Sequence, residues 1–284
     1  MPWVKKKGLY LPDSTSYAES VNAFQDDFTT PGYLYISMGF SLPEVNPPGT
    51  YIWLTPLNKR VSNDSYKIAV LIYGDAYTYE NAKIQFEWGD GTTVITPGAV
   101  VPRRGYKIVQ CVLQVGAGGG ITINGAAYKG LADTTTISDP VSNLKISGMP
   151  IDGYPIFVDH LVIGTTPPPW FIADAWGGAK WASTTPELLG QPFLVDLHWA
   201  MLEGLVDPTQ FLHFYTFQEL DNNGNVPDYG SNPQPLALYG NAQLAEAYEV
   251  EPQFNPTIVY DVHALRLEAK VRPFRMKANL RREG

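Results

Sequence analysis

The chain has 284 residues, enough for one large domain or two ordinary ones, and its 17% charged, 13% aromatic, 26 Gly and 24 Pro residues are typical of short strands joined by many loops. The net charge of −8 is unevenly distributed along the chain: residues 5–7 carry +3 and residues 266–284 carry +5, which leaves −16 on the residues between them. This acidic body argues against nucleic acid or anionic lipid as a partner. The single Cys111 excludes an internal disulfide, and no apolar run reaches the roughly 18 residues of a membrane-spanning helix.

In chain order, residues 1–15 are predicted to be an extended arm, because Pro2, Gly8 and Pro12 oppose a long helix. Strands are then expected wherever apolar, aromatic and β-branched residues stand between turn formers, and 83–88 alternates with a period of two. Asn124-Gly125 is a strong hairpin signal. The predicted strands are 33–40, 51–54, 66–73, 83–88, 92–96, 106–115, 121–123, 144–146 and 156–163. This pattern predicts an all-β protein, with an antiparallel two-sheet jelly-roll sandwich over residues 16–166.

A proline run at 167–169 is read as a stiff hinge, and the domain boundary is predicted there. Residues 167–263 are predicted to be a loop-rich extension with one helix near 193–206, which Asp207-Pro208 would end. Residues 264–284 are predicted to be a basic C-terminal arm with a half-buried edge strand at its start.

The phrases DDFTTPG, YLYISMGF, YKIVQCVLQV, ITINGAAYKG and PIFVDHLVIGT follow one another between residues 26 and 165. Their order resembles the concanavalin A-like, laminin-G-type jelly roll, in which an acidic residue such as Asp159 precedes the last core strand. Two features depart from that pattern. Asn124-Gly125 stands where Asp-Gly is common, and the usual opening tryptophan is missing. The resemblance covers about residues 16–166.

A jelly roll with Pro-rich loops, no cysteine framework, no signal peptide and a basic tail is similar to structural components of tailed bacteriophage particles. This likeness implies a virion protein without enzymatic activity, made in the host cytoplasm and not secreted, such as a capsid decoration, fibre, neck or baseplate piece. Its partners would be copies of itself and other virion proteins, with no direct nucleic acid and no membrane. The expected assembly residues in the two basic ends are Lys5, Lys6, Lys7, Arg272, Phe274, Arg275, Met276, Lys277, Arg281 and Arg282.

No motif in the sequence indicates catalysis, a metal or a cofactor. A glycoside hydrolase needs two carboxylates across its cleft, and the nearest pair, Glu219 and Asp221, runs directly into a turn. The glycine run 116–120 is followed by a strand and not by a helix, so it is read as a loop with no phosphate site. There is no Gly-x-Ser-x-Gly elbow, and the four histidines lack metal-ligand spacing. Catalytic residues, metal and cofactor are therefore all predicted to be absent.

Glycan binding is the alternative function, and a glycoside hydrolase is the less favoured one. Jelly-roll lectins hold sugars with exposed aromatic rings and with Asn or Asp side chains in loops. The residues that could serve here are Tyr77, Tyr79, Asn81, Trp176 and Trp181, and the ligand would be a host-surface glycan.

Overall fold

The computed structural model describes residues 6–26, 28, 32–41, 51–73, 81–102, 106–123, 129–148, 152, 154–165, 171–173, 179–181, 197–202, 204 and 206–248, some of them by backbone alone. All of these belong to the first of two compact units, Met1–Val250; the second unit is Glu251–Gly284. The description below therefore concerns the first unit.

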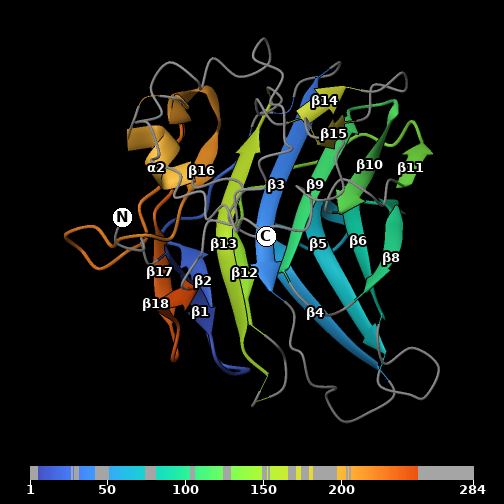
Figure 1. Ribbon diagram of the computed structural model, residues 1–284. Helices are drawn as coiled ribbons and strands as arrows, with labels where there is room; N and C mark the ends of the chain where they lie inside the picture. The colour runs from blue at the N-terminus through green and yellow to red at the C-terminus, as the bar shows by residue number, and fades with distance from the viewer. Residues whose placement is uncertain are drawn as a thin grey trace, which may run out of the picture. The chain divides into compact units, whose positions relative to one another are not determined.

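Two antiparallel sheets form the body of this unit (Figure 1). Sheet A has the strand order β11-β10-β9-β3-β13-β1-β18, and β16 also pairs with β13. Its strands are β1 (Lys6–Leu11), β3 (Tyr33–Ser41), β9 (Tyr106–Gln114), β10 (Gly118–Ile123), β11 (Lys129–Ala132), β13 (Ile156–Gly164), β16 (His213–Tyr215) and β18 (Gln243–Tyr248).

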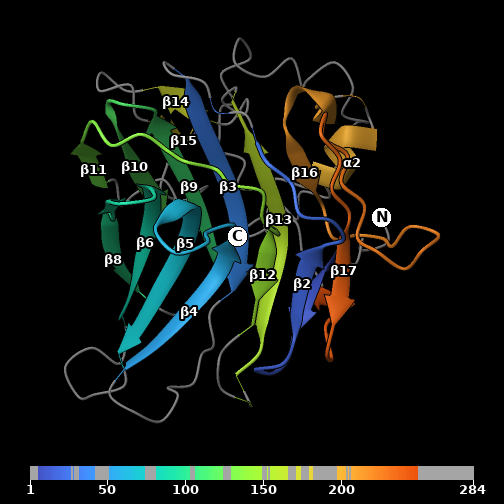
Figure 2. The same ribbon diagram turned by 180° about the vertical axis from the view of Figure 1, so that it is seen from behind.

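Sheet B has the order β17-β2-β12-β4-β5-β6-β7, and β8 pairs with β6. Figure 2 views the unit from the side on which β4 and β5 lie in front. The strands of sheet B are β2 (Tyr17–Ser20), β4 (Tyr51–Asn58), β5 (Asp64–Tyr73), β6 (Asn81–Asp90), β7 (Val94–Ile95), β8 (Gly98–Pro102), β12 (Lys145–Ser147) and β17 (Leu236–Tyr239). A separate hairpin joins β14 (Phe171–Ala173) to β15 (Ala179–Trp181).

One apolar core fills the space between the two sheets, because alternate side chains of each strand point to the same face. From β5 and β6, Tyr66, Phe86 and Trp88 are fully buried, and Phe40 of β3 joins the same cluster. Cys111 also lies in this core, as its apolar surroundings predict, and burial raises the pKa of its thiol well above the ordinary value. The predicted antiparallel two-sheet sandwich is therefore confirmed.

The first strand corrects the prediction of an N-terminal arm. Residues Lys6–Leu11 form β1, which lies between β13 and β18 and pairs with both. Leu9 and Leu11 are completely buried in the core. The alternation of these two leucines was the local signal for a strand, and the glycine and prolines around them obscured it. Lys6 and Lys7 belong to this strand.

The C-terminal extension is also corrected, because its strands join both sheets. β16 and β18 belong to sheet A and β17 to sheet B, so residues 206–248 are part of the sandwich. The turn between β17 and β18 needs a glycine: Gly240 has a φ of 63°, and a Cβ there would lie 2.5 Å from the Thr15 carbonyl oxygen. Helix α2 (Leu197–Leu202) lies within the predicted range 193–206. None of the described helices is long and apolar enough to cross a membrane.

Candidate functional site

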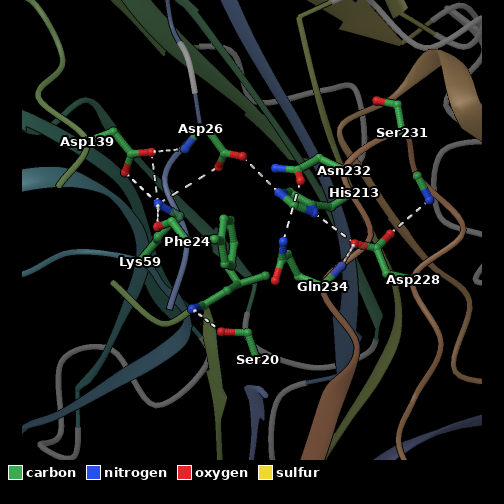
Figure 3. Close-up of polar contacts among 12 residues, drawn as sticks. Ser20, Phe24, Asp26, Lys59, Asp139, His213, Asp228, Ser231, Asn232 and Gln234 are labelled. Carbon is green, nitrogen blue, oxygen red and sulfur yellow. Dashed lines mark hydrogen bonds and ion pairs between the residues drawn. The ribbon is translucent and has the colours of Figure 1, made fainter. Parts of the chain in front are cut away.

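A chain of buried charged side chains connects the sandwich to its C-terminal strands (Figure 3). Lys59 Nζ donates to both carboxylate oxygens of Asp139, at 2.7 and 2.8 Å, and to the Phe24 carbonyl oxygen at 3.2 Å. It also lies 4.0 Å from an oxygen of Asp26. The side chains of Lys59 and Asp26 are completely buried. Burial raises the pKa of Asp139, although its hydrogen bonds to Lys59 and Ser65 act in the opposite direction.

The second half of this network is an aspartate–histidine–aspartate bridge. His213 Nε2 lies 2.9 Å from Asp26 Oδ1, and His213 Nδ1 lies 2.8 Å from Asp228 Oδ2. Asp228 is held further by the backbone N–H groups of Phe214, Gly230 and Gln234, at 2.7–2.9 Å. Because all three bridge side chains are sealed from solvent, their charges are compensated inside the protein.

The position of the network indicates a structural role. Its members come from the segment before β3, from the β4–β5 turn, from the segment before β12 and from residues 213–234. It therefore ties the late strands β16 and β17 to the early part of the chain. It has no exposed member that could meet a substrate, and among the described residues no group of three or more His, Cys, Asp or Glu side chains could hold a metal ion.

A second polar cluster lies on the outer face of sheet A. Ser37 Oγ is 3.1 Å from His160 Nε2, and His160 Nδ1 is 3.0 Å from Asp159 Oδ2. A β-bulge between Val158 and His160 interrupts the alternation that normally sends neighbouring side chains to opposite faces. Ser37, His160 and Asp159 thus stand in the order nucleophile, base and orienting carboxylate that is found in a serine hydrolase. Ser37 is, however, completely buried, and nothing in the described structure gives a substrate access to its oxygen.

The outer face of sheet B carries an exposed apolar row. Trp53 pairs with Leu71, Leu71 with Lys83, and Lys83 with Val100, so the four residues form one line across β4, β5, β6 and β8. Each stands next to a core residue in sequence and so points away from the core. Trp53 is 47% exposed and Val100 60%, while Leu71 and Lys83 are half-buried. We call these four residues the outer strip.

Polar side chains border the outer strip on the same face. A Cβ at position 98 would lie 2.8 Å from Gln85 Cγ and 3.3 Å from Lys83 Cε, so both side chains pass over Gly98. Farther along, Glu87 accepts from Arg60 at 2.5 Å and from Lys67 at 3.1 Å. Among the described side chains, the strip is a row of three apolar residues and one lysine, and the largely buried Gln85 and Glu87 flank it on one side.

The described residues cover few of the side chains predicted to bind glycans or to assemble. Tyr77, Tyr79 and Trp176 lie outside them, and Asn81 and Trp181 are described by backbone only, in β6 and β15. Lys5 and the whole C-terminal set at 272–282 also lie outside. Lys7 is in sheet A, where its backbone N–H donates to Gln218 Oε1 at 3.0 Å.

The outer strip was missed in the sequence because Trp53 stands in a short predicted strand whose faces are equivalent until the partner sheet is known. The buried network was missed for a different reason. His213 and Asp26 are 187 residues apart, and no local spacing relates them.

Together, the fold and the sites of the described residues define a two-sheet antiparallel β-sandwich with a buried ionic network and a partly exposed outer strip. No family model and no curated protein matches the sequence. Among solved structures, the receptor-binding domain of botulinum neurotoxin D is similar at 10% identity and a TM-score of 0.44, over 63% of this chain and 48% of that one. The serotype D ligand-binding domain in complex with N-acetylneuraminic acid is similar at 11% identity and a TM-score of 0.43, over 63% and 47%.

The present chain therefore spans about half the length of those domains. At 10–11% identity and TM-scores below 0.5, the likeness does not transfer their binding activity to this chain.

Proposed function

We propose that this protein is a non-enzymatic, lectin-like binding module that holds a glycan on the outer face of sheet B. The observation that carries the proposal is the outer strip, where Trp53 and Val100 are exposed in line with Leu71 and Lys83. An exposed tryptophan in line with a further apolar residue and a lysine on one sheet face is the kind of surface that supports a contact site.

The shape of the strip favours a sugar over a protein partner. A sugar has an apolar C–H face and a polar rim, which suits an exposed tryptophan ring in line with a lysine ammonium group. A stable protein–protein interface needs roughly 800 Å² on each partner, with an apolar centre several residues wide. Among the described side chains of the strip, only Trp53 and Val100 are exposed, and they do not form such a centre.

The loop singled out in the sequence joins the two middle strands of this face. Residues 74–80, which contain Tyr77 and Tyr79, connect β5 to β6, and Leu71 and Lys83 stand only two residues inside the hairpin ends of those strands. Tyr77 and Tyr79 themselves lie outside the described residues and stay a prediction from the sequence.

Assembly into a bacteriophage particle, with a virion location, remains a separate prediction. That prediction rested on the two basic ends, the aromatic excess and the absence of a catalytic motif, and one of the basic ends now contributes β1 to sheet A. Only the C-terminal segment is left to serve as an arm, so we place glycan binding ahead of assembly.

The test is a glycan array on the full chain, followed by titration calorimetry on the ligands that bind. Trp53→Ala should weaken binding at least about tenfold, as the loss of a central aromatic contact does. Leu131→Ala is the matched control, because Leu131 is similarly exposed (44%) but lies on edge strand β11 of sheet A. Unchanged affinity in Trp53→Ala, or an array without any bound glycan, would contradict the proposal.

A further inference from the structure

Lys83 stands out among the cations on the outer face of sheet B. Lys67 and Arg60 are both paired with Glu87, at 3.1 and 2.5 Å. Lys83 makes no ion pair in the described part of the chain, although it lies between two apolar members of the strip. Its ammonium group is thus available to a ligand.

The fold also fixes where this ammonium group can reach. The lysine stem passes over Gly98, which leaves room for it, and runs beside Gln85. Trp53 and Lys83 lie on strands two positions apart, and neighbouring strands are separated by about 4.8 Å, so their backbones are roughly 10 Å apart. The lysine stem leans toward β8, which flanks β6 on the side away from β4, so the ammonium group lies farther from Trp53 than the backbone spacing. A glycan of two or more sugar residues is therefore needed to contact both side chains.

We infer that the outer strip selects acidic glycans: one sugar ring stacks on Trp53 while Lys83 binds a carboxylate of a neighbouring sugar residue in the same glycan. This inference rests on the proposed function and names its ligand class. A carboxylate suits the site because it accepts charge-assisted hydrogen bonds from the ammonium group.

The protein's net charge of −8 does not oppose this contact strongly. At physiological ionic strength, the fields of exposed charges are screened over about 8 Å, whereas the Lys83–carboxylate contact is direct. The choice between acidic and neutral sugars is therefore decided at the strip and not by the overall charge.

The experiment compares two forms of one ligand that differ only in charge. The probes are oligogalacturonate and its methyl ester, supported by sialyl-lactose and lactose, each titrated against the full chain. We expect the wild type to bind the acid about fivefold more tightly than the ester, the upper range for a partly exposed ion pair. Lys83→Gln should abolish that preference, and Lys83→Arg should keep it. Lys67→Gln, on the same face but paired with Glu87, is the matched control and should also keep it.

The outcomes separate this inference from the proposed function. If acid and ester bind equally, or if Lys83→Gln keeps the preference, the inference is wrong. If Trp53→Ala still weakens the binding of both the acid and the ester in that case, the glycan site itself stands. If neither form of either pair binds, or if Trp53→Ala binds as well as the wild type, the inference and the proposed site fall together.

Discussion

Raising the pH should weaken the fold through one buried histidine. Burial lowers the pKa of His213, but hydrogen bonds to Asp228 and Asp26, together with their charges, outweigh it and raise the pKa to about 9. The ordinary value is 6.5. The folded chain therefore keeps an imidazolium at this position over a pH range in which the unfolded chain has lost it.

The sign and size of the effect follow from these two values. A group whose pKa is raised on folding stabilises the fold fully below its unfolded pKa, and that stabilisation is lost as the pH passes through the folded pKa. For His213, the free energy of unfolding should fall between pH 6.5 and about 9. At 1.36 kcal/mol per pKa unit, the difference between the folded and the ordinary pKa of His213 corresponds to about 3 kcal/mol of stability.

The assay is urea unfolding at pH steps from 6 to 10, on the wild type and on His213→Gln, which cannot take up a proton. The variant is needed because Lys107 titrates in an overlapping range. Burial lowers the pKa of Lys107 to about 8, so its effect has the opposite sign and increases stability as the pH rises from about 8 to 10.5. Subtracting the variant's free energy of unfolding from that of the wild type at each pH removes the contribution of Lys107.

We expect the stability difference between wild type and variant to shrink by about 3 kcal/mol between pH 6.5 and 9. A difference that stays constant across this range would refute the reasoning, because it would mean that His213 is neutral when folded. Should the variant not fold, nitrogen NMR of the wild type at pH 8 gives the same answer: both ring nitrogens of His213 should carry protons.

Two further predictions concern the buried lysine and the C-terminal arm. Lys59→Met should lower the free energy of unfolding by about 3–5 kcal/mol, because it leaves buried carboxylates without their partner. Lys67→Met, the control, should lower it by no more than about 1 kcal/mol. Equal losses in urea unfolding would show that the buried Lys59 ion pair does not stabilise the fold. Deleting residues 272–284 should leave a folded sandwich that no longer assembles in sedimentation, with Phe274→Ala more harmful than Arg275→Ala, and a truncated chain that assembles normally would disprove the arm.

Local signals in the sequence were sufficient for the long strands of the first half that follow residue 32, although not for β1, β2 and β8. The stretch predicted as 83–88 is the centre of Asn81–Asp90, and 66–73 lies within Asp64–Tyr73. Both were found because period-two alternation and flanking turn formers are properties of neighbouring residues. The same logic failed at the glycine run: residues 118–120 open strand β10. Gly118 has a φ of 127°, and a Cβ there would lie 2.3 Å from the Leu131 carbonyl oxygen. A glycine is needed at this position because β11 lies too close for a side chain.

By itself, the sequence determined the class of fold, the longer strands between residues 33 and 163 and the burial of Cys111, since each depends on a short window of side chains. The shorter strands β8 and β11 were not predicted. Only the tertiary structure decided that β1 and residues 206–248 complete the sheets, because strand pairing joins segments that no sequence spacing relates. It also decided the fate of two tryptophans. Trp88 is fully buried and Trp53 is 47% exposed, although both stand in apolar strands of sheet B. The physical reason is that a strand has two equivalent faces, and the opposing sheet determines which one becomes the core.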